Sequence, residues 1–174
     1  RGATIRGPLF IMRSLGAVWP ASNSTLYLFF LSVPLLLGFQ DALASDRTGQ
    51  HRLIVLTDIK ADPDDEQSLV RLVLYANEID IEGIIATTST HRRSDPASEA
   101  IRDILAAYGE VHANLVLHDP SYPTEETLLR LVKEGSPAYG MSGVGKGRSS
   151  EGSDWIIRSL RQDDERPLWI SVWG

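Results

Sequence analysis

Four aspartates lie within eight positions of this chain, directly after a short apolar run. The apolar run covers residues 53–56, and the carboxylates that follow belong to Asp58, Asp62, Asp64 and Asp65. If the run is a buried strand, the acids lie at its carboxyl end, where open α/β sheets bind ligands. Carboxylate oxygens are the ligands that hard cations such as Ca²⁺ and Mg²⁺ prefer. The pattern therefore indicates a cation site at the edge of a sheet.

The same residues also fit the start of a helix that has no function attached. Asp62 could be the N-cap and Pro63 the first helical residue, with acids in the first turn. Asp58 lies outside such a helix, and closely packed like charges raise the energy unless a cation or a proton offsets them. Thr88 and His91 follow the next apolar run and would lie on the same sheet edge. These two observations favour a functional site over simple capping.

Apolar periodicity predicts strands and helices in alternation around this cluster. A strand over 52–57, a helix over 64–77 and a strand over 81–87 form a βαβ unit, which implies a parallel sheet with a right-handed crossover. The later expected elements are helices over 96–108, 124–134 and 153–161, strands over 115–117 and 167–172, and a Gly- and Ser-rich loop over 135–152. The fold class is therefore α/β, with a mostly parallel sheet and flanking helices.

The first part of the chain has the pattern of a secretory signal peptide. Arg13 precedes an apolar run over 26–39, and a small-x-small pattern, Ala-Leu-Ala, ends at Ala44. A membrane anchor is the alternative, but the run is shorter than the about 20 residues that a spanning helix needs. We expect residues 1–44 to be upstream sequence and signal peptide. Residues 45–174 would then be secreted or periplasmic, with no stable membrane span after cleavage.

Charge and composition exclude several classes of protein. The net charge is −6, with the acids dispersed along the chain. Nucleic-acid binding requires a basic patch, so we expect no nucleic-acid partner. The chain has no cysteine, which excludes thiol catalysis and cysteine-based zinc sites.

Two sets of motifs resemble a known superfamily. The run LTDIKADPDD at 56–65, followed by a helix and then IEGIIATTST, resembles the opening of the nucleoside hydrolases. The stretches HDPSYPTEETLLRLVKEGSPAYGMSGVGKG, EGSDWIIRSL and RPLWISVWG resemble the nucleoside-hydrolase-like domain of secreted cellulose-binding proteins. The resemblance runs from about Arg52 to Gly174. It implies a nucleoside-hydrolase-like fold, of which we expect 45–174 to be the amino-terminal part, truncated at its carboxyl end.

The resemblance also implies roles for the aspartates. Asp58, Asp62 and Asp65 would hold Ca²⁺, Asp62 would act as general base, and Asp64 would contact the sugar. A gap-free alignment would instead place Lys60 at the position of the base. We prefer the alignment that places Asp62 there, because it supplies a carboxylate where the chemistry needs one.

Thr88 and His91 are the expected substrate-binding residues outside the acidic motif. His91 lies near the position at which the superfamily has an asparagine that contacts the sugar. The superfamily's histidine-glycine loop corresponds here to the run that begins Tyr139-Gly140, in which the histidine is missing. A later metal ligand of the superfamily would lie beyond Gly174.

The function implied is secreted hydrolysis of N-glycosidic or related glycosyl bonds by a metal-held water. The substrate would be a small nucleoside or a carbohydrate. The alternative is a non-catalytic module on the same fold that binds a polysaccharide such as cellulose. Aromatic rings stack on sugars, but we expect Trp155, Trp169 and Trp173 to pack in the core instead.

Overall fold

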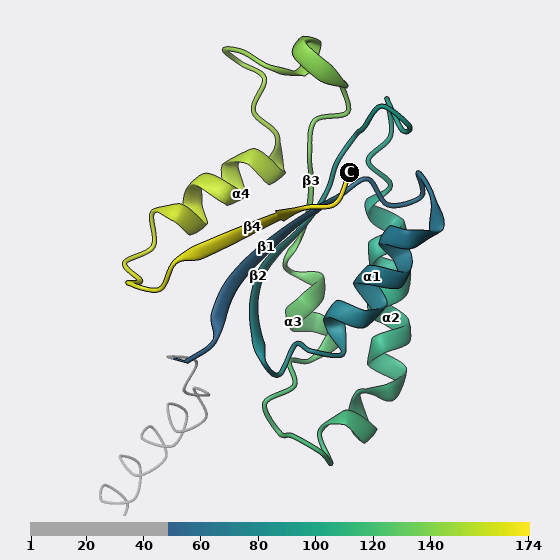
Figure 1. The fold of residues 1–174 in the computed structure, drawn as a ribbon, viewed down its shortest axis with the longest axis vertical. Helices are drawn as coiled ribbons and strands as arrows, with labels where there is room; N and C mark the ends of the chain where they lie inside the picture. Colours follow the sequence, from purple (N-terminus) through teal and green to yellow (C-terminus); the bar gives the residue numbers. More distant parts are fainter. Residues whose placement is uncertain (1–48) are drawn as a thin grey trace, which may run out of the picture. The chain divides into compact units, whose positions relative to one another are not determined.

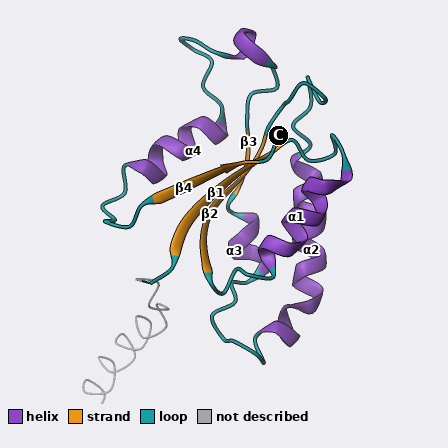
Figure 2. Cartoon of the chain, in the orientation of Figure 1, coloured by secondary structure: helices purple, strands orange, loops and turns teal. Residues whose placement is uncertain are grey.

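The computed structural model describes residues 49–174, and the predicted leader over residues 1–44 lies outside the described residues. The described chain forms a four-stranded sheet in the order β3-β2-β1-β4, and every neighbouring pair is parallel (Figures 1 and 2). Its strands are β1 His51–Thr57, β2 Ile79–Ala86, β3 Val132–Glu134 and β4 Leu168–Val172. The predicted α/β class with a parallel sheet is confirmed.

Helices cover both faces of this sheet. They are α1 Pro63–Val73, α2 Ser98–Leu115, α3 Glu125–Leu129, the short 3₁₀ helix η1 Gly140–Gly143, and α4 Glu151–Leu160. The helices α1, α2 and α3 lie on one side of the sheet and α4 lies on the other (Figure 1). A strand covered on both faces needs apolar side chains at successive positions, which explains the continuous apolar run of β1.

The main core lies between the sheet and the pair of helices α1 and α2. Ile84 of β2, Leu69 of α1, and Ile101 and Leu105 of α2 are all fully buried there. On the other face, the indole of Trp155 in α4 donates a hydrogen bond to the Glu82 carbonyl oxygen at 2.7 Å. The core thus fixes β1 and β2, whose carboxyl ends bear the candidate residues.

The helix α2 is longer than predicted. It continues through Gly109 to Leu115, so the expected end at residue 108 and the expected strand over 115–117 are wrong. A Cβ at Gly109 would meet the side chain of Glu125 at the start of α3. Gly109 is therefore a point of close approach between two helices and does not end the helix.

Only the first part of the predicted helix over 124–134 is helical, and the rest contains a strand. The helix α3 ends at Leu129, and the next residues turn into β3, which pairs with β2. Val132 is in register with Ile84 and is buried. A three-residue strand is too short to show a period of its own, so only the pairing with β2 reveals it. The first helix also ends earlier than predicted, at Val73 instead of residue 77.

The tryptophans follow the prediction only in part. Trp155 packs on β2, and Trp173 packs against the buried core. Trp169 is 58% exposed on the edge strand β4, so the expected core position is wrong for this residue. Within residues 49–174, no helix combines the length and the apolar character needed to cross a bilayer.

Charged residues at the amino end of the sheet form a compensated network. Arg52, which is 3% exposed, donates to both carboxylate oxygens of Glu82, at 2.5 and 3.1 Å. Arg52 also donates to the Ser159 carbonyl oxygen at 2.8 Å. Arg166 pairs with Asp80 at 2.9 Å and with Asp164 at 2.6 Å. Each buried charge at this end therefore lies beside an opposite charge.

Candidate functional site

A tight turn joins β1 to α1 and returns the chain to the carboxyl edge of the sheet. The Ala61 amide donates to the Asp58 carbonyl oxygen at 2.9 Å, and Lys60 between them has a φ of 75°. A non-glycine residue in this left-handed region is uncommon, and such strained positions cluster at functional sites. The turn places Asp62 close to Asp58.

Asp62 occupies the N-cap position of α1 without capping it. Its backbone is extended and Pro63 follows as the first helical residue, as the capping interpretation expects. The Asp62 side chain makes no capping hydrogen bond. It lines a pocket at the sheet edge instead, together with Asp58 and Asp64. Helix capping therefore explains the position of this residue but not the direction of its carboxylate.

This pocket, which we call the acid pocket, is open and has a volume of about 520 Å³. Its walls come from the segments that follow β1, β2, β3 and β4, so the carboxyl ends of the strands converge on it. It is lined by Asp58, Asp62, Asp64, Thr88, Ser89, Thr90, His91, Tyr139, Trp173 and Gly174. Five of the six residues predicted from the sequence are among them. This is the place at which open parallel sheets bind ligands.

Asp65, the sixth predicted residue, lies beneath the pocket and is 5% exposed. The Thr57 hydroxyl donates to its carboxylate at 2.5 Å. Burial raises the pKa of Asp65, and a hydrogen bond with the Asp58 side chain raises it further, whereas the bond from Thr57 lowers it. Asp58 and Asp65 thus form a close carboxylate pair.

A second carboxylate pair lies at the surface of the pocket. The pKa of Asp62 is raised, chiefly by a hydrogen bond with the Asp64 side chain, and then by the nearby charges of the other aspartates. Like charges this close favour protonation of one partner or the approach of a cation. The Lys60 ammonium does not supply that charge directly, because it pairs with Glu66 at 2.6 Å.

The donor chemistry of the four aspartates fits a hard cation, since their ligand atoms are carboxylate oxygens. Within residues 49–174, however, no group of three or more acidic or histidine side chains is arranged to hold a metal ion. The aspartates are arranged as two pairs, Asp58 with Asp65 and Asp62 with Asp64. The described residues therefore supply the oxygen donors that a hard cation prefers, but as two separate pairs and not as one group of three.

Several pocket residues were not predicted as site residues. Ser89 anchors the turn after β2, because its hydroxyl accepts hydrogen bonds from the amides of His91 and Arg92 at 3.0 and 3.2 Å. Tyr139 and Trp173 come from loops after β3 and β4. A Cβ at Gly174 would meet the Asp58 carboxylate, so Gly174 lies close against this side chain. The sequence signal for Thr90 was its place beside Thr88 in the run TTST, and Tyr139 begins the run that corresponds to the superfamily's histidine-glycine loop.

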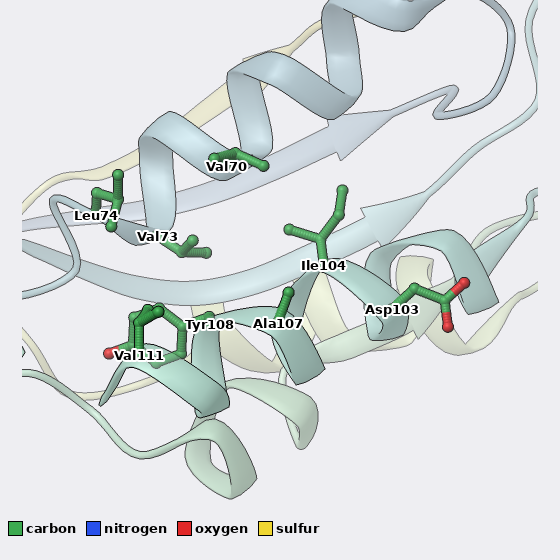
Figure 3. A pocket seen from close by; sticks show the side chains of 8 residues that line it. All are labelled: Val70, Val73, Leu74, Asp103, Ile104, Ala107, Tyr108 and Val111. Carbon is green, nitrogen blue, oxygen red and sulfur yellow. The ribbon is translucent and has the colours of Figure 1, made fainter. Parts of the chain in front are cut away.

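Another cavity lies away from the acids, between α1 and α2. It has a volume of about 300 Å³, and Figure 3 shows its lining. Apart from the Asp103 carboxylate and the Tyr108 hydroxyl, its side chains are aliphatic: Val70, Val73, Leu74, Ile104, Ala107 and Val111. The Tyr108 hydroxyl donates to the Pro123 carbonyl oxygen at 2.6 Å, so it serves packing. This cavity brings no pair of reactive groups together.

A parallel α/β sheet with carboxylates converging at its carboxyl edge is the arrangement expected from the sequence for a nucleoside-hydrolase-like domain. The chain belongs to the family described as cellulose-binding Sde182, nucleoside hydrolase-like domain, whose model matches residues 52–174. The predicted resemblance is therefore confirmed.

A solved structure shares this fold. It is described as a nucleoside hydrolase-related hypothetical protein from Saccharophagus degradans that is associated with carbohydrate metabolism. It is 44% identical in sequence, with a TM-score of 0.70, over 72% of this chain and 31% of its own length. The chain therefore spans less than a third of that relative. No curated protein matches the chain.

Proposed function

We propose that this protein hydrolyses N-glycosidic or related glycosyl bonds, and that the acid pocket is its substrate site. One observation supports this most directly. The Asp62 carboxylate lines the pocket beside Asp58 and Asp64 although its backbone occupies a helix N-cap position. A residue that only capped the helix would direct its carboxylate to the backbone amides of the first turn.

In this proposal Asp62 is the general base. It would accept a proton from a water that attacks the anomeric carbon. A general base works best when its pKa lies near the operating pH, and the pKa of Asp62 is shifted upward, in that direction. Asp64 would accept a hydrogen bond from a sugar hydroxyl. Thr88 and His91, in the segment after β2, would contact the rest of the substrate.

We further propose that the full-length protein uses Ca²⁺ here, held by Asp58, Asp62 and Asp65. When bound, the ion would supply positive charge that orients water and sugar hydroxyls and offsets the crowded carboxylates. The raised pKa values of Asp62 and Asp65, one in each pair, support this assignment, because each pair would gain from a nearby cation.

The test uses the full-length protein and a panel of nucleosides, with release of reducing sugar as the readout. We expect hydrolysis of at least one nucleoside, which a chelator should abolish and added Ca²⁺ should restore. Asp62→Asn should lower kcat by about 10²- to 10⁴-fold, the usual contribution of a general base. The matched control is Asp163→Asn, the same chemical change at an exposed residue that precedes β4, and it should leave turnover intact. If Asp62→Asn retained full activity, the assignment of the base would be wrong.

Binding of polysaccharide without catalysis is the second candidate. The family description names cellulose binding, and aromatic side chains line or flank the sheet edge. Sedimentation with crystalline cellulose would separate the two functions. A pure binding module should sediment equally with or without chelator and release no sugar, whereas the proposed hydrolase requires the metal for turnover.

Export of the protein is part of the same proposal. The signal-peptide pattern before residue 45 supports a secreted or periplasmic location. Amino-terminal sequencing of the exported protein should begin at Ser45 or within a few residues of it. Recovery of an uncleaved chain from the membrane fraction would contradict this.

A further inference from the structure

Two aromatic side chains, Tyr139 and Trp173, line the acid pocket without a role in the proposed hydrolysis. Trp173 packs against the core, whereas Tyr139 lies in the loop between β3 and α4 and is 41% exposed. Tyr139 lines the same pocket as the carboxylates of Asp58, Asp62 and Asp64. The pocket therefore combines acids, hydroxyls and an aromatic ring.

The position of Tyr139 is fixed by contacts on several sides. The Arg93 guanidinium lies over the tyrosine ring, 5.4 Å from its centroid. Arg93 is itself held, because its Nε donates to the Thr90 carbonyl oxygen at 3.1 Å. The Ser142 hydroxyl donates to the Tyr139 carbonyl oxygen at 2.9 Å. A ring held in this way loses little conformational freedom when a ligand packs on it.

The loops that bear these two residues are also joined by a hydrogen bond. The Thr88 hydroxyl donates to the Ser136 carbonyl oxygen at 3.3 Å, which joins the segment after β2 to the segment after β3. Arg93 and Tyr139 form a second link between the same two segments. Tyr139 is thus a supported wall of the pocket.

We propose that Tyr139 is a specificity-determining residue that stacks on the ring of a neutral sugar, with Arg93 as its positioning residue. This inference rests on the proposed function, since it assigns a substrate class to the same pocket. The apolar C–H face of a sugar ring would pack on the tyrosine, and its hydroxyls would donate to the carboxylates. The carboxylates would disfavour a phosphorylated or acidic sugar by charge repulsion. Arg93 does not line the pocket, and its guanidinium lies over the tyrosine ring instead.

The experiment measures sugar binding to the full-length protein by saturation-transfer NMR titration, with a chelator present so that no cation offsets the carboxylates. The probes are cellobiose and ribose as neutral sugars, and ribose 5-phosphate as the anionic match of ribose. The neutral sugars should bind more tightly than ribose 5-phosphate. Tyr139→Ala should raise their Kd by about tenfold, the loss expected for one aromatic contact. Tyr139→Phe should stay within about twofold of the wild type, because the ring is kept.

Two further variants separate stacking from general damage to the loop. Arg93→Gln should raise Kd by about two- to fivefold, the range of an exposed cation–π contact. Met141→Ala is the matched control, because Met141 is 82% exposed in the same loop and does not line the pocket. It should leave Kd unchanged.

The binding readout does not depend on turnover, so the two proposals can fail separately. Binding that depends on Tyr139 in a protein without hydrolytic activity would support this inference and overturn the proposed function. Wild-type Kd in Tyr139→Ala, equal binding of ribose and ribose 5-phosphate, or no binding of either neutral sugar would each overturn the inference.

Discussion

The two ends of the same sheet differ in how their charged side chains are paired. At the amino end, Arg52 and Arg166 lie against Glu82, Asp80 and Asp164. At the carboxyl end, aspartates lie beside other aspartates, and the nearest basic side chain in the turn is paired with a glutamate outside the pocket. The strands are common to both ends, so the fold does not impose the difference. The amino end follows the rules for stability, and the carboxyl end violates them.

This contrast indicates which end binds a ligand. Compensated buried charges hold a structure together, whereas crowded like charges with raised pKa values are typical of functional sites. Asp58, Asp62 and Asp64 at the carboxyl end line an open pocket beside one another, whereas Arg52 at the amino end is 3% exposed and donates to Glu82 and to the Ser159 carbonyl oxygen. We therefore interpret the first as a binding site and the second as a structural clamp.

The largest expected effect is the loss of the clamp. Arg52→Met would leave the Glu82 carboxylate, 11% exposed, without its bidentate partner. Breaking a buried ion pair by removing one partner destabilises a protein by about 3–5 kcal/mol. Denaturant unfolding of the full-length protein would measure this loss. The double variant Arg52→Met, Glu82→Leu should recover most of it, because no unpaired charge remains.

A matched surface pair controls for the removal of any arginine. Arg130 pairs with Glu126 at 3.1 Å, and both side chains are well exposed. Arg130→Met should therefore change the free energy of unfolding by no more than about 0.5 kcal/mol. Equal losses for the two arginine variants would remove the distinction between a buried clamp and an ordinary surface pair.

A smaller effect of opposite sign is expected at the carboxyl end. Asp65→Asn removes one charge of a crowded buried pair and retains an oxygen that can accept from Thr57. In chelated protein at neutral pH, this substitution should raise the free energy of unfolding by about 1 kcal/mol, a usual size for a single stabilising substitution, because it removes repulsion between two carboxylates. Thermal unfolding with and without Ca²⁺ would measure it, and the advantage should shrink or reverse when Ca²⁺ is added. Destabilisation in the chelated protein would show that the charge supports the fold.

The smallest expected effect is in the pH dependence, which should differ in direction between the two ends. The neighbouring Arg166 lowers the pKa of Asp164 to about 2. Its contribution to stability is present above an ordinary aspartate pKa of about 4 and is lost as the pH falls towards 2. The raised pKa of Asp65 has the opposite sign, so its favourable contribution is lost as the pH rises through that pKa.

Acid titrations of two variants would test this difference. Asp164→Asn should flatten the loss of stability between about pH 4 and 2. Asp65→Asn should flatten the change at higher pH and leave the acid side alone. Unaltered slopes in both variants would mean that these two carboxyls do not govern the pH dependence.

The sequence predicted the elements whose patterns are local. The strand β1 and the aspartates after it were found because a continuous apolar run followed by acids needs no partner to be recognised. The strand β3 was missed because three residues around Val132 become a strand only by pairing with Ile84. The length of α2 exceeds the predicted one because a glycine after an apolar helical run commonly ends a helix, whereas the role of Gly109 is set by its contact with α3.

The candidate site follows the same rule. Asp58, Asp62, Asp64, Thr88 and His91 line the pocket because they follow adjacent strands, and the βαβ pattern already placed those strand ends together. Tyr139 enters the pocket through a loop whose path depends on the missed strand β3. Its contribution could not be predicted without the correct sheet order.

The most direct test of the account is calorimetric titration of the chelated full-length protein with Ca²⁺. The account predicts a binding heat in the wild type, and a Kd raised at least tenfold in Asp65→Asn and in Asp62→Asn. The control Glu126→Gln, at an exposed residue of α3 that pairs with Arg130, should bind as the wild type does. If the wild type gives no Ca²⁺ heat, the crowded aspartates are not a cation site, and the central claim about the carboxyl end of the sheet is contradicted.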